Sequence, residues 1–209
     1  MYLIIVGTGA MGQMVRECAG EDKTFDRIEM VEPLDGNWPE EKADLIIDFS
    51  HPKAIKGIYE YCLKQGGGIH VVMGTTGQTA EEEQLIRMLE KICPLVRKSN
   101  FSRGIEAMNE LLKKIKNILP AAEIHIEEIH HKKKIDAPSG TAKTMCKTLD
   151  EDASRVGSIR MGTVPGTHRV YFALEDEILE ITHTAYSKKI FAKGALEVGK
   201  TLANSKNTY

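Results

Sequence analysis

Short apolar runs that alternate with helical patterns are the feature that most limits how this chain can fold. Aliphatic, β-branched runs occupy residues 2–6, 28–31, 45–47, 69–73 and, more weakly, 94–96. Helical periodicity fills most of the intervals between them, at residues 10–19, 52–65 and 79–92. Strands that are apolar on both faces and separated by helices form a parallel sheet covered on both sides. The first half of the chain therefore predicts a Rossmann-like, doubly wound α/β domain.

The connection between the second and third of these strands is too short for a helix. Only eleven residues separate Glu32 from Asp44, and Pro33, Gly36 and Pro39 among them break helices. A parallel crossover needs about a dozen residues at minimum. We therefore expect a bare loop where such folds normally carry a helix.

Beyond Ser99 the pattern is that of an α+β domain with a mixed sheet. A helix is predicted at 104–119, with an apolar stripe of Ile105, Met108, Leu111, Leu112, Ile115 and Leu119. An alternating strand at 123–129 and a short helix at 139–149 follow. Further strands are predicted, without helices between them, at 159–161, 168–174 and 178–185. With a last helix at 190–203, we expect a discontinuous first domain, residues 1–102 and 189–209, and an inserted second domain, residues 103–188.

Composition excludes several classes of protein. The chain has 209 residues and a net charge of −2, which argues against a general nucleic-acid binder. No apolar run approaches the ~20 residues that span a bilayer, and the N-terminus reads as a strand rather than a signal peptide. The cysteines form no C-x-x-C pair, so we expect reduced, buried thiols in a cytoplasmic protein.

A glycine-rich motif follows the first predicted strand and opens the first helix. It is G-x-G-x-x-G and consists of Gly7, Thr8, Gly9, Ala10, Met11 and Gly12. In this context the glycines allow a tight turn, the approach of a pyrophosphate and close helix–strand packing. The phosphates would bind the free N–H groups of the helix N-terminus. A purely structural turn is the alternative.

Glu32 ends the second predicted strand. A carboxylate there accepts hydrogen bonds from both ribose hydroxyls of NAD and repels a 2′-phosphate. No Lys or Arg follows before Lys42. We therefore expect NADH to be preferred, with NADPH as an alternative, unless Glu32 is only a solvated carboxylate.

Two polar turns follow the next strands, where open α/β sheets bind ligands. One contains Phe49 and Ser50, in the stretch Asp48-Phe49-Ser50-His51-Pro52, and the other is Gly74-Thr75-Thr76-Gly77. The second turn offers backbone and hydroxyl groups with little bulk, which suits the carboxamide ring of a nicotinamide.

Residues 128–142 are the most informative stretch for chemistry. Ser139 is a natural helix N-cap, and Gly140 and Thr141 then offer N–H groups and a hydroxyl to an anion. His130 and Lys134 combine a proton donor near neutral pH with a fixed cation. This combination predicts a site for a carboxylate substrate that must be protonated. We expect the pKa of His130, which lies among lysines, to be lowered.

Two other interpretations of this stretch are weaker. Adjacent His130 and His131 rarely converge on one ion, and no cysteine or Glu-x-x-His partner frames them, so we expect no metal site. Lys132 and Lys133 fit a solvated basic loop.

The stretch Glu-x-His-His-x-x-Lys-x-Asp-Ala-Pro-Ser-Gly-Thr-Ala resembles the signature of the dihydrodipicolinate (4-hydroxy-tetrahydrodipicolinate) reductase family. The glycine loop, residues 48–52, 74–77 and 99–104, and the closing blocks 180–185 and 191–195 extend the resemblance over most of the chain. It implies an NAD(P)H-dependent oxidoreductase of the diaminopimelate pathway of lysine biosynthesis. The substrate is a small cyclic dicarboxylate that receives hydride from the nicotinamide.

The resemblance also implies residue roles. His130 matches the general acid, and Lys134 matches a second essential residue that binds substrate. Contacts to the substrate are implied for His131, Lys134, Ser139, Gly140 and Thr141. Contacts to the cofactor are implied for residues 7–12, Glu32, Phe49, Ser50, Gly74, Thr75, Thr76, Ser99, Asn100 and Phe101. The first domain would bind the dinucleotide, and the second would bind substrate and form a homotetramer.

The chain departs from the family pattern in three places. It is shorter than usual, mostly at 33–42, beside the carboxylate of Glu32. Thr167 stands where many relatives carry glutamate, and Lys188 where many carry arginine.

Two other functions remain open from the sequence. Another NAD(P)-dependent oxidoreductase, such as a diaminopimelate or amino-acid dehydrogenase, explains the glycine loop but not the His-His-x-x-Lys and Ser-Gly-Thr blocks. A dinucleotide sensor without catalysis would be expected to lack the acid, whereas His130 and Lys134 are both present.

Overall fold

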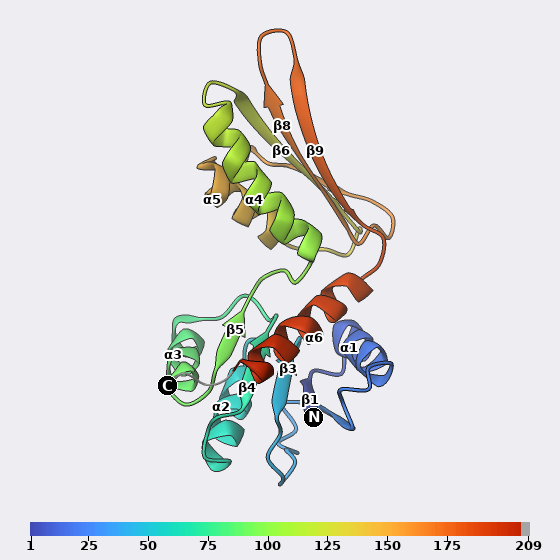
Figure 1. Ribbon diagram of the computed structural model, residues 1–209, viewed down its shortest axis with the longest axis vertical. Helices are drawn as coiled ribbons and strands as arrows, with labels where there is room; N and C mark the ends of the chain where they lie inside the picture. The colour runs from blue at the N-terminus through green and yellow to red at the C-terminus, as the bar shows by residue number, and fades with distance from the viewer. Residues whose placement is uncertain (206–209) are drawn as a thin grey trace. The chain divides into compact units, whose positions relative to one another are not determined.

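The computed structural model describes residues 1–205, and the chain forms two compact units (Figure 1). One unit contains Met1–Phe101 together with the C-terminal stretch from Phe191. The other is the intervening segment, Ser102–Ile190. No helix among the described residues is long and apolar enough to cross a membrane.

The first unit is built on a parallel five-stranded sheet in the order β2-β1-β3-β4-β5. The strands are β1 (Tyr2–Val6), β2 (Arg27–Val31), β3 (Leu45–Asp48), β4 (His70–Met73) and β5 (Leu95–Arg97). The helices of this unit are α1 (Ala10–Gly20), α2 (Ala54–Lys64), α3 (Ala80–Glu90) and α6 (Lys189–Asn204). This arrangement confirms the predicted Rossmann-like sheet.

Alternating side chains of the central strands build two separate cores. Ile4 and Ile46 belong to a buried cluster with residues of α2 and α3. Leu3 and Ile5 point to the other face and pack with residues of α1 and α6. A strand buried on both faces reads as a continuous apolar run, which is why these strands were recognisable in the sequence.

The crossover from β2 to β3 contains no helix, as predicted. Its one tryptophan, Trp38, stacks on Tyr61 of α2 with ring centroids 5.2 Å apart. The Tyr61 hydroxyl donates to the carbonyl of Glu41 (2.6 Å) and accepts from the N–H of Ala43 (3.0 Å). A Cβ on Gly57 would lie 3.0 Å from the Trp38 ring, so the glycine is what lets the indole lie flat on α2. The Trp38 side chain thus anchors the loop on the apolar core that contains residues of α2.

Helix α6 returns to the first sheet from the far end of the chain. Ala192, Ala195 and Leu196 are buried in the α1-side core. A Cβ on Gly194 would lie 1.9 Å from the carbonyl oxygen of Phe101, so the backbones approach too closely for any side chain. Lys200 Nζ also pairs with Asp22 Oδ2 at 2.6 Å, beyond the end of α1.

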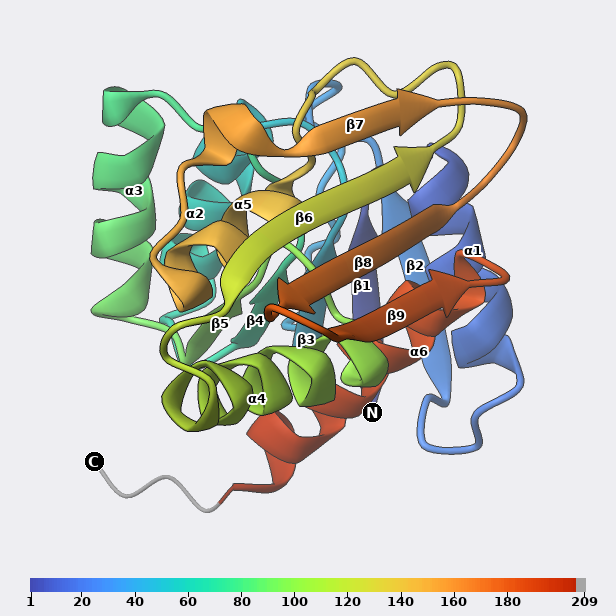
Figure 2. The ribbon, with the colours of Figure 1, turned by 90° about the horizontal axis from the view of Figure 1, so that it is seen from above.

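The second unit is a four-stranded mixed sheet in the order β7-β6-β8-β9, which Figure 2 shows in sequence. The strands are β6 (Glu123–His130), β7 (Gly157–Arg160), β8 (Gly166–Ala173) and β9 (Ile178–Ala185). Strands β6 and β7 pair in parallel, and the other pairs are antiparallel. Helices α4 (Arg103–Ile118) and α5 (Gly140–Leu149) lie on one side of this sheet (Figure 1), and a short 3₁₀ helix, Ala153–Arg155, follows α5.

The apolar stripe of α4 is narrower than the sequence predicted. Ile105, Met108 and Leu112 are buried against the sheet. Leu111, which we placed on the same stripe, is 50% exposed. It follows Met108 by three residues and precedes Leu112 by one, so it lies at the edge of the stripe, where the sheet no longer covers the helix.

The close approach at Gly194 gives a test of this packing. Gly194→Ala should lower the free energy of unfolding by about 1–3 kcal/mol, because its methyl group meets backbone rather than a movable side chain. Gly20→Ala is the control, since nothing lies within 4 Å of its added Cβ. Helix propensity should make that variant up to about 1 kcal/mol more stable than the parent. Urea unfolding measures the stability of both variants. Equal changes in the free energy of unfolding would contradict the close backbone contact at Gly194.

Candidate active site

The predicted dinucleotide loop has the geometry that its glycines require. Gly7 has a φ of 103°, and its N–H donates to the carbonyl of Val31 at 2.9 Å. A Cβ on Gly12 would lie 1.9 Å from the Gly7 carbonyl oxygen, which explains the close packing of α1 on β1. Nothing lies within 4 Å of a Cβ on Gly9, so the backbone there is open to an approaching group. Helix α1 begins without a side-chain cap or an acidic first turn, which fits an anion at its N-terminus.

Glu32 lies just beyond β2, which is an edge strand of the first sheet. Its Oε2 accepts a hydrogen bond from Thr8 Oγ1 at 2.9 Å. The glycine loop and the carboxylate predicted to bind ribose are therefore adjacent, and the Thr8 hydroxyl fixes the carboxylate beside the loop.

Three strand ends of the first sheet come together beside that loop. The Phe49 and Phe101 rings meet edge-on with centroids 5.6 Å apart. The N–H of Ser50 donates to Thr75 Oγ1 at 2.9 Å, which links the ends of β3 and β4. A Cβ on Gly74 would lie 2.1 Å from the Phe49 ring, so the ring fills the place of a side chain there.

The remaining predicted cofactor residues lie around this cluster with more solvent exposure. Ala10 and Met11 form the first turn of α1. Thr76 and Ser99 are exposed, and Asn100 is half-buried beside the buried Phe101.

The buried carboxylate of Asp48, at the end of β3, holds Ser50 in the cluster of strand ends. Asp48 is 1% exposed, and its Oδ1 accepts from both the N–H and the hydroxyl of Ser50. Its Oδ2 is buried and has no hydrogen-bond partner among residues 1–205. Burial raises the pKa of Asp48 to about 6, against the lowering effect of the hydrogen bonds from Ser50 and Thr75.

In the second unit, the signature residues cluster around the end of β6. Glu128 and His130 lie on the same face of this strand as Ile124 and Ile126, and all four are buried. His130 Nδ1 is hydrogen-bonded to Glu128 Oε2. Two buried polar groups thus continue an apolar stripe, and they are buried together because each satisfies the other.

Helix α5 presents its N-terminus next to this pair. Ser139 caps the helix, with its hydroxyl accepting from the N–H of Ala142 at 3.2 Å. The Ser139 N–H donates to Glu128 Oε1 at 3.3 Å, and its hydroxyl lies 3.2 Å from His168 Nε2. Gly140 and Thr141 form the first turn beyond the cap. The structure therefore brings the predicted residue Ser139 into contact with Glu128, the partner of His130, and Gly140 and Thr141 follow it in the helix.

The lysine-rich loop separates into paired and solvated residues. Lys134 Nζ pairs with Asp136 Oδ1 at 2.7 Å, and the Lys134 N–H donates to the His131 carbonyl at 3.0 Å. His131 is half-buried, whereas Lys132 and Lys133 are exposed, as expected of a solvated basic loop. Asp136 keeps Lys134 near the site, where a substrate carboxylate would compete for the ammonium.

The histidines in this cluster have lowered pKa values. Burial lowers the pKa of His130, Glu128 opposes this effect, and the charges of Lys134 and Arg160 lower the pKa further. The direction confirms the expectation from the sequence, but burial rather than the lysines is the largest cause. Burial also lowers the pKa of His131, and the charge of Lys188 is the next largest cause. For His168, burial and then His130 lower the pKa to about 3.

The sequence reasoning missed three residues of the cluster. Glu128 was quoted as part of the motif without a role, and Arg160 and His168 were not singled out. Arg160 Nη2 pairs with Glu128 Oε1 at 2.7 Å, and the His168 and His130 rings meet edge-on at 5.2 Å. Strand alternation could have found Glu128, since a carboxylate on a buried face requires a partner.

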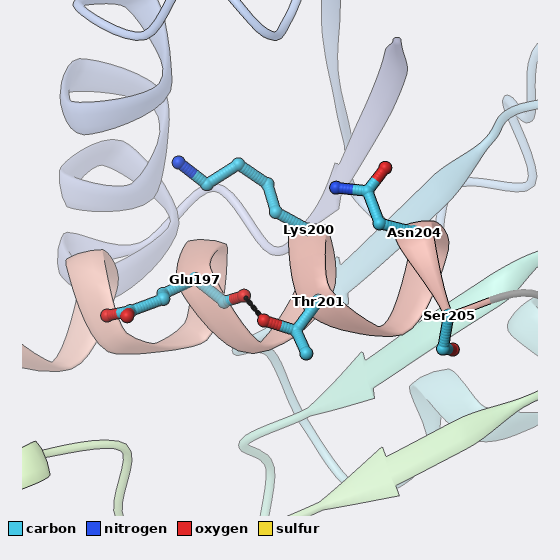
Figure 3. A pocket seen from close by; sticks show the side chains of 5 residues that line it. All are labelled: Glu197, Lys200, Thr201, Asn204 and Ser205. Carbon is cyan, nitrogen blue, oxygen red and sulfur yellow. Dashed lines mark hydrogen bonds between the residues drawn. The ribbon is translucent and has the colours of Figure 1, made fainter.

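A hollow on α6 contains none of the predicted site residues. It is lined by Glu197, Lys200, Thr201, Asn204 and Ser205 (Figure 3). The Thr201 hydroxyl donates back to the Glu197 carbonyl, and Lys200 is paired with Asp22. Its polar groups serve the helix itself, so we assign it no function. Among residues 1–205, no group of three or more His, Cys, Asp or Glu side chains could hold a metal ion.

Comparison with known proteins identifies relatives over nearly the whole chain. Residues 34–101 match the family described as "Dihydrodipicolinate reductase, N-terminus", and residues 104–209 match "Dihydrodipicolinate reductase, C-terminus". The 4-hydroxy-tetrahydrodipicolinate reductase of Thermosipho africanus is 35% identical, with 96% of this chain and 90% of that protein covered. The enzyme of the same name from Bdellovibrio bacteriovorus is 37% identical, with 95% and 89% covered.

Solved structures share the fold. A dipicolinate-bound dihydrodipicolinate reductase from Paenisporosarcina sp. TG-14 superposes with a TM-score of 0.74 at 19% identity, covering 97% of this chain and 95% of that one. GenD2 from gentamicin A biosynthesis, in complex with NAD, gives a TM-score of 0.64 at 10% identity, covering 100% of this chain and 88% of that one. At these identities both comparisons concern the fold alone.

The buried carboxyl of Asp48 predicts a pH-dependent stability. Its folded-state pKa of about 6 lies above the ordinary value of 3.8, so the folded state binds the proton more tightly. Stability from this group is present at low pH and is lost as the pH rises through about 6. Asp48→Asn should therefore be more stable than the parent near neutral pH, by up to about 3 kcal/mol, and the difference should shrink near pH 4.

Urea unfolding at several pH values measures this difference. Asp35→Asn, on the exposed crossover loop, is the control. A stability difference between Asp48→Asn and the parent that stays constant with pH would show that the Asp48 carboxyl is not destabilised by burial.

Proposed function

The chain belongs to the dihydrodipicolinate reductase family, and we propose that its two units divide that family's reaction between a nicotinamide dinucleotide and a small cyclic dicarboxylate. The family's reaction, which this chain carries out, is the reduction of 4-hydroxy-tetrahydrodipicolinate in the diaminopimelate route to lysine. When bound, the dinucleotide supplies the hydride. The residues of the chain bind and orient the dinucleotide and the dicarboxylate, and they protonate the dicarboxylate.

The first unit holds the dinucleotide. The loop from Gly7 to Gly12 binds the pyrophosphate, because the backbone at Gly9 is open and the start of α1 has no side-chain cap. Phe49, Ser50 and residues 74–76 with 99–101 would hold the nicotinamide ring, which supplies the hydride. This assignment is supported by the hydrogen bond and ring contact that join these strand ends.

Glu32 selects NADH over NADPH. Its carboxylate is held beside the glycine loop by Thr8, where a ribose 2′-hydroxyl can donate to it and a 2′-phosphate is repelled. The short crossover that follows brings no Lys or Arg before Lys42 to bind a phosphate.

The second unit holds the substrate. Its carboxylates bind to Lys134, His131 and the first turn of α5 at Ser139, Gly140 and Thr141. The support is chemical: a dianion needs cations and free N–H groups, and both lie within this stretch. Negative charge that develops on the ring during hydride transfer is stabilised by the Lys134 ammonium.

His130 donates the proton. Its Nδ1 is occupied by Glu128, which leaves Nε2 as the atom that can protonate the ring. A lowered pKa in the free enzyme makes the imidazolium a strong acid once the substrate dianion has favoured its protonation.

From membership of this family we also propose that the protein is a cytoplasmic homotetramer. The second sheet supports an assembly surface, because the described helices of that unit, α4 and α5, lie on one side of it (Figure 1). Ile178, at the start of β9, is 66% exposed.

The observation that carries the proposal is the buried group of Glu128, His130 and Ser139 next to Lys134. Its test is an assay in which the enzyme turns over the product of dihydrodipicolinate synthase. Turnover is measured as the loss of absorbance of the reduced nicotinamide. Turnover of amino acids instead would indicate a dehydrogenase, and dinucleotide binding without any turnover would indicate a sensor.

Substitution at the two central residues separates their roles. His130→Gln should lower kcat by about 10²–10⁴-fold with a smaller change in KM, because only proton donation is lost. Lys134→Ala should impair both, because it removes a cation that binds the substrate as well as the transition state. Steady-state kinetics measures both variants, and near-normal turnover by His130→Gln would exclude it as the acid.

Cofactor choice tests Glu32. The parent enzyme should have a kcat/KM for NADH roughly tenfold or more above that for NADPH. Glu32→Ala should bring the two values together, mainly by improving the use of NADPH. The same substitution at Glu17, on α1, is a control with no predicted effect on the ratio. A clear preference of the parent for NADPH would contradict the assignment.

A further inference from the structure

Behind His130 lies a buried ion pair whose role the proposed reaction does not yet explain. Glu128 is 0% exposed, and its two oxygens are divided between neighbours. Oε2 is bonded to His130 Nδ1, and Oε1 accepts from Arg160 Nη2 at 2.7 Å and from the Ser139 N–H at 3.3 Å. The carboxylate is thus the centre of the cluster.

Arg160 connects this carboxylate to the lysine loop. The same Nη2 atom donates to the carbonyl oxygen of Asp136 at 2.6 Å, while the Asp136 side chain holds Lys134. One guanidinium on β7 therefore reaches the partner of His130 and the backbone of the residue that pairs with Lys134.

The edge of the His130 ring opposite Glu128 faces a glycine. A Cβ on Gly166 would lie 3.0 Å from His130 Nε2, so a side chain at that position would press on this nitrogen. Within residues 1–205 the ring is therefore hydrogen-bonded at Nδ1, to Glu128, and has no hydrogen bond at Nε2, which leaves Nε2 as the nitrogen that can exchange a proton.

We propose that Glu128 and Arg160 are positioning residues for proton donation: Glu128 fixes Nδ1 of His130 as the nitrogen that keeps its proton, and Arg160 holds Glu128 ionised and aligned. The transferred proton leaves from Nε2, and neutral His130 retains N–H at Nδ1. This inference rests on the proposed role of His130 as the acid.

The charges around His130 determine in which direction the loss of Glu128 would move the pKa of His130. Glu128 faces the ring from β6, Arg160 from β7, His168 from β8 and Lys134 from the following loop. Of these groups, only Glu128 stabilises the imidazolium, whereas Lys134 and Arg160 oppose it. Burial alone would raise the pKa of Glu128, but hydrogen bonds from Arg160 and His130 lower it, which keeps the carboxylate charged.

Fold stability does not account for the pair. A buried ion pair gains little over well-packed apolar residues, because both charges must be stripped of water. A residue with a purely structural role would change the unfolding transition and leave the pKa of His130 unchanged. A positioning residue changes that pKa and the tautomer.

The direct test is Glu128→Gln in the full-length enzyme. The amide removes the charge with little change in size and binds either His130 tautomer. We expect kcat to fall by about 10–1000-fold with a smaller change in KM. Activity falls as His130 loses its proton, so the decline of kcat with rising pH should move about one unit or more toward lower pH.

Glu127→Gln is the matched control. Glu127 is the preceding residue on β6, lies on the opposite face of the sheet and pairs with Arg169 at 3.3 Å. It loses the same charge, and its pH profile should equal that of the parent. A shift in both variants would mean that net charge, and not position, is responsible, which would overturn the proposal.

A measurement on the unaltered protein keeps the proposal testable if Glu128→Gln does not fold. Long-range ¹H–¹⁵N NMR reports the tautomer of His130, assigned by comparison with His130→Gln. We expect the proton on Nδ1 in the neutral form, and a proton on Nε2 would overturn the proposal. Arg160→Lys retains the charge but not the two-pronged set of guanidinium donors. Its kcat should therefore lie between that of the parent and that of Arg160→Gln.

These results separate this inference from the proposed function. If His130→Gln is inactive and Glu128→Gln behaves as the parent, His130 is the acid but Glu128 does not position it. If His130→Gln is fully active, the acid itself has been misassigned. If the parent does not turn over the dicarboxylate, the proposed function fails before either variant is made.

Discussion

A parallel sheet with apolar side chains on both faces must be covered by helices on both, and the rest of this structure follows from that requirement. Helices α2 and α3 cover one face, but the helix-free crossover leaves α1 as the only helix from the first half of the chain on the other face. The C-terminal helix α6 supplies the missing cover, and its glycine at position 194 allows it to approach the backbone at Phe101. Because α6 comes from the end of the chain, the second unit has to be an insertion. The division of the chain into two units is thus a consequence of how the first sheet is covered.

Burial of polar groups organises the candidate residues within each unit. In the first unit, Asp48 lies under the strand ends and fixes Ser50, and in the second unit Glu128 fixes His130. The two carboxyls differ in their partners. Arg160 compensates for the burial of Glu128 and lowers its pKa, whereas Asp48 has only neutral donors and its pKa is raised. The first is therefore suited to hold a charge next to a histidine, and the second to organise a turn without placing a strong charge beside a cofactor.

Most of the fold could be read from the sequence because each signal was local. Strands such as β1 are continuous apolar runs, and the glycine loop, the N-cap Ser139 and the proline-rich crossover are short motifs with one physical meaning. Leu111 was misplaced because helical periodicity gives the direction of a side chain but not the width of the surface that covers it. Arg160 and His168 were missed for a different reason. They come from β7 and β8, and only the pairing of these strands with β6 brings them next to His130. No local pattern encodes such a register.

In the proposed function, the short crossover after Glu32 links the fold to cofactor choice. With no helix there, Trp38 is the group that anchors the loop, and it does so on α2, on the face of the sheet away from α1. Strand β2 remains an edge strand, and the Glu32 carboxylate at its end is held by Thr8 rather than by a neighbouring strand. The loop carries no arginine or lysine before Lys42. In the proposed function, the shortening that simplifies the fold therefore also leaves no cation in residues 33–41 to bind a 2′-phosphate, and Glu32 is the group proposed to discriminate between the two dinucleotides.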